Sequence, residues 1–371
     1  MAKNRIVYII SDINKSLEFE WLIDEWKSER YEISFILING DESVLKSHIE
    51  AKMLICQTVK SSRLFDLKGI LRLRKILKKL RPDIVHCHLL KASFQGLVAA
   101  KLAGIHVRIH TRHHGSFHHS YHPKGVLLDR LINHLSSHVV AISQNVKEIL
   151  VEKEGVQAKK INIIHHGFKL ELFHKPKLED VNLLRAKYQI GDHYPVIGVI
   201  SRFFELKGIQ YTIDAFAEVL KDHPNALLIM ANARGPYSVE IDTCLRDMPN
   251  ENYLQIPFEE DIFSLYQLFD VHIHVPIDQN VEAFGQTYVE ALAAGIPSIF
   301  TLSGVAREFI KNNENALVVD FRQSYQIYQS IRQLLSSEDL RKRLVQNGEK
   351  SIEPFKFSNM MDQLEKLYDE C

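Results

Sequence analysis

Short apolar runs alternate with longer amphipathic stretches along the first half of the chain. The apolar runs predict β-strands at residues 6–10, 33–38, 84–88, 107–110, 139–142 and 161–164. The stretches between them predict α-helices at residues 17–27, 66–80, 92–102, 125–135 and 145–154. Strands that are apolar on both faces are typical of a parallel sheet covered by helices on both sides. We therefore expect one such sheet in this half.

The same alternation starts again after residue 180. Strands are predicted at residues 195–200, 226–230, 271–275, 298–301 and 316–319. Helices are predicted at residues 183–188, 209–220, 262–268 and 287–294, and the chain turns helical toward its end. The stretch between the two series, around 170–193, is rich in Lys, Pro, Asp and Gly. The chain is therefore expected to be an α/β protein with two successive doubly wound units, which bind ligands at the carboxyl ends of their strands.

Composition narrows the classes of protein that fit. The chain has 371 residues, of which 46% are hydrophobic and 25% charged, as in an ordinary globular protein of about two domains. It lacks an apolar run of about 18 residues, so no transmembrane helix is expected, and its first apolar run is too short for a signal peptide. A cytoplasmic location fits best, because the cysteines show neither zinc-site nor disulfide spacing: Cys56, Cys87, Cys244 and Cys371.

A net charge of zero hides a strong asymmetry between the two halves. Residues 1–180 contain 29 Lys and Arg against 19 Asp and Glu, a net charge of +10, and 15 of the 19 histidines. The remaining residues carry a net charge of −10. A basic half suits an anionic acceptor or a membrane surface. No nucleic-acid partner is expected.

One stretch of the second half combines a glycine turn, a helix and a buried strand. Seven residues lie between Glu282, which precedes the predicted helix, and Glu290, which lies inside it. Gly295 is expected to end the helix as a C-terminal cap. Backbone N–H groups at the helix start would be available to an anion or a polar ligand, at Phe284, Gly285 and Gln286.

A second motif follows the first predicted strand of that half. The stretch 198–208 reads Gly-Val-Ile-Ser-Arg-Phe-Phe-Glu-Leu-Lys-Gly, and it places Arg202 and Lys207 in the loop after the strand. A guanidinium group offers a planar fork of donors and an ammonium group a compact charge, which together suit a diphosphate. The alternative to a diphosphate site is that both residues are ordinary surface cations.

Both motifs resemble those of the retaining glycosyltransferases of family 4, Glu-x7-Glu and Gly-x3-Arg-x4-Lys-Gly. The resemblance covers nearly the whole chain and implies the GT-B fold, two doubly wound Rossmann-like domains facing a cleft. Residues 1–175 would form the acceptor-side domain, with the C-terminal helix 355–371 packed onto it. Residues 190–354 would form the nucleotide-sugar donor domain.

The resemblance also implies roles for individual residues. Arg202 and Lys207 would stabilise the leaving diphosphate, so that neither a metal nor another cofactor is required. Glu282 would contact the transferred sugar. Further donor contacts are expected from Glu290 at the ribose hydroxyls, and from Phe284, Gly285, Gln286 and Thr287. The stretch 109–115 resembles the family's Thr-x-His at a strand end, which makes His113 the residue facing the sugar, with His114 as the alternative.

The implied reaction moves a sugar from a nucleoside-diphosphate sugar to a hydroxyl acceptor with retention at the anomeric carbon. The acceptor would be a saccharide or a lipid-linked saccharide, in the synthesis of cell-surface polysaccharide or glycolipid. One alternative is a nucleotide-sugar epimerase, which would release the nucleoside diphosphate without an acceptor. Another is an inactive sugar-nucleotide-binding relative, which would lack part of the Arg-Lys or Glu-Glu set, whereas all four residues are present.

Seven histidines lie between residues 106 and 122, several of them four residues apart. That spacing would place ligands for a metal ion on one helix face. However, Gly115 and Pro123 argue against a continuous helix, and no carboxylate or cysteine accompanies the histidines in this run. We therefore expect no metal here, and favour a hydrogen-bonding acceptor loop.

The predicted helix 66–80 is the most basic stretch of the chain. Seven cations lie between residues 67 and 81. An apolar stripe is expected to face the core: Leu67, Ile70, Leu71, Leu77 and Leu80. The alternative is contact between the cations and anionic lipid headgroups, which would make the protein peripheral at the inner face of the membrane.

Overall fold

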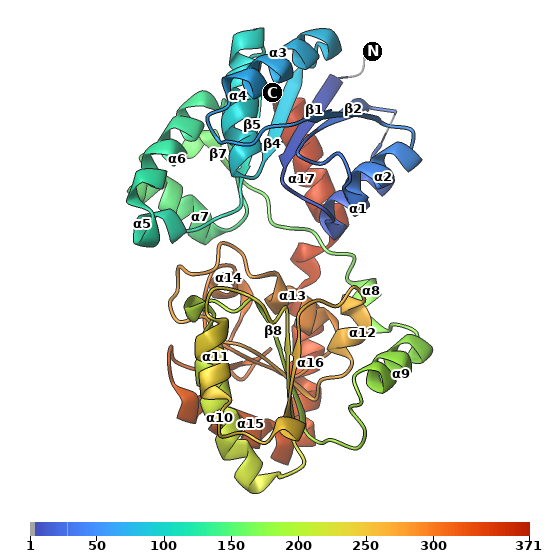
Figure 1. Cartoon of the computed structure of the whole chain (residues 1–371), viewed down its shortest axis with the longest axis vertical. Helices are drawn as coiled ribbons and strands as arrows, with labels where there is room; N and C mark the ends of the chain where they lie inside the picture. Colours follow the sequence, from blue (N-terminus) through green and yellow to red (C-terminus); the bar gives the residue numbers. More distant parts are fainter. Residues whose placement is uncertain (1–3, 28) are drawn as a thin grey trace. The chain divides into compact units, whose positions relative to one another are not determined.

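The computed structural model describes residues 4–27 and 29–371 and divides into two compact units. Unit 1 comprises Met1–Gly167 and Ser358–Cys371, and unit 2 comprises Phe168–Phe357 (Figure 1). Each unit is built on one sheet whose strand pairs are all parallel. The prediction of two doubly wound parallel sheets is therefore confirmed.

The sheet of unit 1 has seven strands in the order β3-β2-β1-β4-β5-β6-β7. Their bounds are β1 (Asn4–Ser11), β2 (Tyr31–Ile38), β3 (Ile55–Val59), β4 (Ile84–His88), β5 (Val107–Arg112), β6 (His138–Ala141) and β7 (Ile161–Ile163). The central strands are almost entirely buried, which agrees with their unbroken apolar sequences. The edge strand β3 alternates between exposed and partly buried positions.

Helices join the strands of unit 1, and one more is added by the end of the chain. They are α1 (Leu17–Asp24), α2 (Val44–Ala51), α3 (Leu67–Leu80), α4 (Leu90–Ala103), α5 (Phe117–Tyr121), α6 (Pro123–Leu135), α7 (Gln144–Glu148) and α17 (Phe357–Glu370). The predicted helix 145–154 is only partly α-helical, because α7 continues as a π-helix at Ile149–Lys153. Gly104 ends α4 in the left-handed conformation, with φ of 83°, as a helix-stopping glycine does.

The side chains of α3 do not follow the predicted stripe. Its buried face consists of Ile70, Leu73 and Leu77, spaced three and four residues apart, and this helix packs against α4. Leu67 is 68% exposed and Leu71 is 49% exposed, so the prediction that these two face the core is wrong. The helix buries a narrower stripe than its apolar residues suggest.

The C-terminal helix α17, red in Figure 1, is held to the first strands of unit 1 by buried polar contacts. The Tyr368 hydroxyl lies 2.5 Å from the Tyr8 hydroxyl and 2.7 Å from Nδ1 of His86. At the edge of this contact, Arg30 forms ion pairs with Glu365 and Asp369 at 2.7 and 2.6 Å. Residues separated by more than 300 positions thus share one core.

Unit 2 has six strands in the order β10-β9-β8-β11-β12-β13. These are β8 (Val196–Ile200), β9 (Leu227–Ala231), β10 (Tyr253–Ile256), β11 (Val271–His274), β12 (Ser298–Phe300) and β13 (Leu317–Val318). The helices are α8 (Glu171–His174), α9 (Leu178–Lys187), α10 (Ile209–Asp222), α11 (Ser238–Cys244), α12 (Ile262–Tyr266), α13 (Gln286–Ala293), α14 (Ala306–Phe309), α15 (Ser324–Ser336) and α16 (Glu338–Ser351). Within residues 4–27 and 29–371, no helix combines the length and apolar character needed to cross a membrane.

Candidate functional site

The loop after β8 presents the two predicted cations of unit 2. Arg202 is exposed, and its guanidinium group lies over the Phe204 ring, 5.0 Å from the centroid. Lys207 ends a short 3₁₀ turn, and Gly208 follows with φ of 72°. A Cβ atom at Gly208 would lie 2.0 Å from the carbonyl oxygen of Val275, so only glycine lets this loop approach the end of β11.

That approach brings Lys207 to the buried carboxylate of Glu282. The two side chains form an ion pair, and Nε2 of His274, the last residue of β11, lies 3.2 Å from the same carboxylate. The Glu282 backbone N–H donates to Oγ of Ser303 at 3.1 Å. A Cβ atom at Gly304 would lie 2.7 Å from Cβ of Glu282, so the chain is also closely packed on this side. Of the predicted residues, the structure therefore brings Lys207 and Glu282 together.

The charge state of this cluster follows from its contacts. Burial would raise the pKa of Glu282, but the positive charge of Lys207 and the hydrogen bond with His274 more than offset it and hold that pKa well below its usual range. Burial lowers the pKa of His274 despite its contact with Glu282. At neutral pH the cluster therefore contains an ionised carboxylate, an ammonium group and a neutral imidazole.

The start of α13 has the backbone shape that the sequence indicated. Gly285 caps the helix in the left-handed region, with φ of 91°, and Gly295 ends it with φ of 71°. Gln286 is exposed in the first turn. Oγ1 of Thr287 is buried without a hydrogen-bond partner in the described part of the chain, which is typical of a group that a ligand satisfies. Phe284 is only 3% exposed and packs its ring against Phe168 at 6.1 Å.

Glu290, on the same helix, lies in a different environment from Glu282. Its carboxylate accepts a hydrogen bond of 2.8 Å from the Tyr266 hydroxyl. Burial raises the pKa of Glu290 to about 7, although the Tyr266 hydrogen bond works in the opposite direction. The sequence resemblance assigned this group to the ribose hydroxyls. Burial therefore favours the protonated form of Glu290 far more than in an ordinary glutamate.

In unit 1, His113 follows β5 and belongs to a row of aromatic side chains. Its Nε2 lies 3.2 Å from Nδ1 of His88, and its ring stacks on His166 with the centroids 5.6 Å apart. Nδ1 of His166 in turn contacts the carboxylate of Glu18. Burial, reinforced by the neighbouring His166, lowers the pKa of His113 to about 3. Its imidazole is therefore neutral at physiological pH, and can exchange hydrogen bonds with a hydroxyl group.

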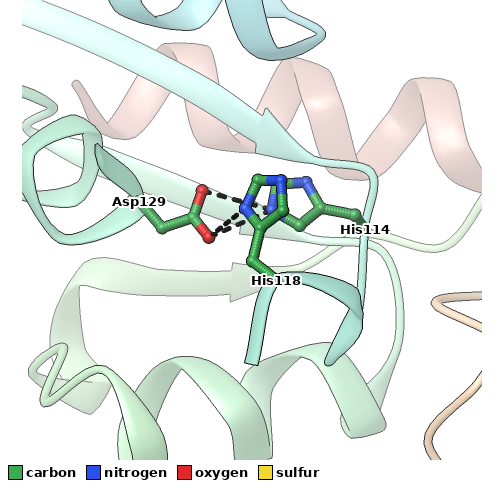
Figure 2. A group of neighbouring side chains, drawn as sticks. All are labelled: His114, His118 and Asp129. Carbon is green, nitrogen blue, oxygen red and sulfur yellow. Dashed lines mark hydrogen bonds and ion pairs between the residues drawn. The ribbon is translucent and has the colours of Figure 1, made fainter. Parts of the chain in front are cut away.

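His114, the alternative to His113, belongs to a separate network. Its Nε2 lies 3.2 Å from the Asp129 carboxylate, and Nδ1 of His118 lies 2.7 Å from the same group (Figure 2). The sequence analysis found no carboxylate accompanying these histidines, and that statement is wrong for the folded chain. Asp129 comes from α6, beyond the histidine run, and the fold of α5 and α6 brings it back to them.

Several residues that contact the predicted site residues were not predicted from the sequence. His274 contacts the Glu282 carboxylate, and the Tyr266 hydroxyl donates to the Glu290 carboxylate. His88 contacts the ring of His113. Two of them, His274 and His88, are the last residues of buried parallel strands. A histidine at the carboxyl end of such a strand is the signal that would have found them, because ligands bind at this edge of a doubly wound sheet.

Comparison with known proteins places the chain in a family. Residues 22–172 match the family model for glycosyltransferase family 4, and residues 180–351 match the model for glycosyl transferases group 1. Together the two matches span most of both units. The chain belongs to the family 4 glycosyltransferases of the GT-B fold, and is a glycosyltransferase.

Individual relatives agree with this assignment. The chain is 25% identical over 378 residues to the capsular polysaccharide biosynthesis glycosyltransferase CapM of Staphylococcus aureus, covering 99% of this chain and 97% of CapM. It is 26% identical over 211 residues to the alpha-monoglucosyldiacylglycerol synthase of Acholeplasma laidlawii, covering 56% of this chain and 52% of that protein. Anabaena HepE, crystallised in complex with UDP and glucose, superposes with a TM-score of 0.85 at 18% identity, covering 99% of this chain and 100% of HepE.

The raised pKa of Glu290 predicts how stability depends on pH. The pKa of about 7 in the folded protein compares with 4.5 for an ordinary glutamate, so between these values the folded state holds a proton that the unfolded state releases. Stability contributed by this group therefore falls as pH rises toward 7. Replacing it by Glu290→Gln removes the titration, and the variant should gain about 2 kcal/mol relative to wild type between pH 5 and pH 8.

Urea unfolding at a series of pH values measures this difference. Glu240→Gln, at an exposed position on α11, is the control and should show no comparable trend. A constant difference between Glu290→Gln and wild type across the range would contradict the proposed protonation of Glu290.

Proposed function

We propose that this protein transfers a sugar from a nucleoside-diphosphate sugar to a hydroxyl acceptor with retention at the anomeric carbon. The observation that carries the proposal is the contact of Lys207 with the buried Glu282 and His274, formed by the loops that follow β8 and β11. A carboxylate kept ionised next to a cation, at the ligand-binding edge of a doubly wound sheet, can bind sugar hydroxyls and phosphate together.

Lys207 and Arg202 are proposed to stabilise the leaving diphosphate. Negative charge grows on the diphosphate as the sugar–phosphate bond breaks, and fixed cations stabilise that charge most in the transition state. The Lys207 ammonium group has three N–H donors, and Glu282 is its partner in the described structure, which leaves donors for phosphate oxygens. The side chain is 23% exposed, so a ligand can reach it. Arg202 adds a second, exposed cation on the same loop.

The remaining predicted residues are proposed to hold the donor in place. Glu282 accepts hydrogen bonds from sugar hydroxyls, and Glu290 binds the ribose. The Gly285 turn, Gln286 and the Thr287 hydroxyl contact the sugar or the phosphate, and the neutral His113 imidazole hydrogen-bonds the transferred sugar. Retention is proposed to proceed by front-side attack, with the leaving phosphate taking up the acceptor proton. None of these side chains is then required as a nucleophile.

The relatives indicate which substrates to test first. UDP and glucose are the molecules in the HepE complex, so a UDP-hexose is the first donor to test. CapM is named for capsular polysaccharide and the Acholeplasma enzyme for a glycolipid. We therefore propose a saccharide or lipid-linked saccharide acceptor, in the synthesis of cell-surface polysaccharide or glycolipid.

We also propose a location in the cytoplasm, peripheral at the inner face of the membrane. Helix α3 and the residues just before it combine exposed apolar and basic side chains. Phe65 and Leu67 are 69% and 68% exposed, and Leu71 is 49% exposed. The exposed cations of this helix are Lys68, Arg72, Lys75, Lys78 and Lys79. Apolar side chains among cations are the composition that binds the headgroup region of anionic bilayers.

Removing either predicted diphosphate contact should lower turnover far more than stability. Arg202→Ala and Lys207→Ala should each cost about 3 kcal/mol of transition-state stabilisation, or roughly a hundredfold in kcat. Turnover is measured with the best donor from a panel of nucleotide sugars, and anomeric configuration is read by NMR. Lys221→Ala, at an exposed lysine on α10, is the matched control. Wild-type turnover in both loop variants, or an inverted product, would contradict the proposal.

The reaction is proposed to need no metal at the donor diphosphate, because Arg202 and Lys207 already supply positive charge there. Turnover should therefore stay within about twofold of the untreated value after treatment with EDTA. Loss of activity that a divalent ion restores would contradict this. Repeating the restoration with His114→Ala would then show whether the ion acts at the diphosphate or in the histidine cluster of unit 1.

Membrane contact through α3 predicts salt-sensitive flotation with anionic vesicles. Each cation near an anionic surface contributes about 1 kcal/mol, so changing Lys68, Lys75, Lys78 and Lys79 to Gln should abolish flotation at physiological salt. A second variant, Phe65→Ser with Leu67→Ser, tests the apolar contribution. The control changes four lysines of unit 2 to Gln: Lys221, Lys311, Lys342 and Lys350. Equal flotation of the α3 variants and wild type, or none by wild type, would contradict membrane contact.

A further inference from the structure

Three neighbouring side chains of unit 1, His114, His118 and Asp129, together offer ligand atoms for a metal ion. One ligand atom each from His114, His118 and Asp129 lies within 4.8 Å of the other two (Figure 2). Figure 2 shows both imidazole rings directed at the carboxylate from the same side. We propose that these three residues bind a divalent transition-metal ion of the zinc class, with a further coordination position directed to a neighbouring cavity.

The local fold supports this arrangement. His114 follows β5, His118 lies on α5 and Asp129 lies on α6. Gly125 is one turn before Asp129 on α6, and a Cβ atom there would lie 2.9 Å from Cγ of the His118 ring. The glycine therefore leaves the space in which His118 reaches Asp129.

Charge balance favours a cation at this position. Asp129 and Glu154 have fully buried side chains, and both pair with Arg112, at 3.0 and 2.6 Å. One guanidinium group thus faces two carboxylates, which His114, His118 and His119 also contact, so one buried negative charge remains when these imidazoles are neutral. An uncompensated charge in a protein interior is costly. A divalent ion with one anionic ligand, such as hydroxide or a carboxylate, would bring the group to neutrality.

The ligand set selects the class of ion. Two imidazole nitrogens and one carboxylate oxygen suit zinc and related transition metals, whereas magnesium and calcium prefer oxygen ligands. Three protein ligands leave at least one position open, as in zinc sites that bind a water molecule or a substrate.

A cavity next to the group supplies room for that additional ligand. Its volume is about 240 Å³, and its lining combines apolar side chains such as Leu90 and Ile132 with His110, Arg112, His113, His114 and Asp129. Two buried atoms on these lining residues have no hydrogen-bond partner in the described structure, Nη1 of Arg112 and Nδ1 of His110. A buried polar group without a partner is rare unless water or a ligand satisfies it. The cavity therefore suits a small anionic or hydrated ligand of the ion.

Zinc binding to the full-length protein tests the proposal directly. Protein stripped with a chelator is titrated with Zn²⁺ in competition with a chromophoric chelator, and Co²⁺ is used as a spectroscopic substitute. Wild type should bind one equivalent tightly, and Co²⁺ should give the visible absorption of a low-coordinate site. His114→Ala and His118→Ala should each weaken binding at least about a hundredfold, since even residues behind the ligands contribute ten- to a hundredfold.

Two further variants separate the site from other causes of binding. Gly125→Ala keeps every ligand and favours the helix, yet should weaken zinc binding because its methyl group displaces the His118 ring. His106→Ala with His134→Ala removes two exposed histidines of the same unit and should leave binding unchanged. The proposal is overturned if wild type binds zinc no more tightly than His114→Ala and His118→Ala. It is also overturned if the exposed-histidine control loses binding equally.

Discussion

The ion pair between Lys207 and Glu282 is the contact on which the candidate site of unit 2 depends. It joins two loops that are 75 residues apart in the chain, and both must approach the end of β11 closely. Glycine at 208 makes the approach of the first loop possible, and glycine at 304 lets the chain after β12 pack against Glu282. Without its cation, the buried Glu282 would take up a proton or force the loop to move, since burial alone raises its pKa. The shape of the loops and the charge of the carboxylate therefore support each other.

Unit 1 contains the same kind of charge pairing, with the positive and negative charges exchanged. There a buried cation, Arg112, lies at the end of β5 and is held by the carboxylates of Asp129 and Glu154. In both units a charge at the carboxyl end of a parallel strand is fixed by residues from distant helices or loops. Such preorganised charge does not have to reorient when a ligand arrives, which is the property that makes it effective in binding and catalysis.

The sequence predicted the central strands and most long helices, because burial on both faces leaves an unbroken apolar run. It missed β3 and β10, whose residues are only partly buried and therefore lack such a run. Family resemblance singled out Lys207 and Glu282, but the contact with His274 depends on strand order. Asp129 joins His114 only through the packing of α5 and α6. Leu67 and Leu71 were wrongly predicted to face the core. Helical periodicity shows which side of a helix is apolar, but it does not show how wide the buried stripe on that side is.

The position of α17 has a consequence for the order in which the protein forms during synthesis. The ribosome produces β1 before unit 2, yet Tyr8 can contact Tyr368 only after all of unit 2 has been made. Unit 2 is continuous in the chain, whereas unit 1 is interrupted by it. A nascent chain can therefore complete unit 2 while the Tyr8 and His86 side of unit 1 still lacks its covering helix, so unit 1 begins before unit 2 and is completed after it.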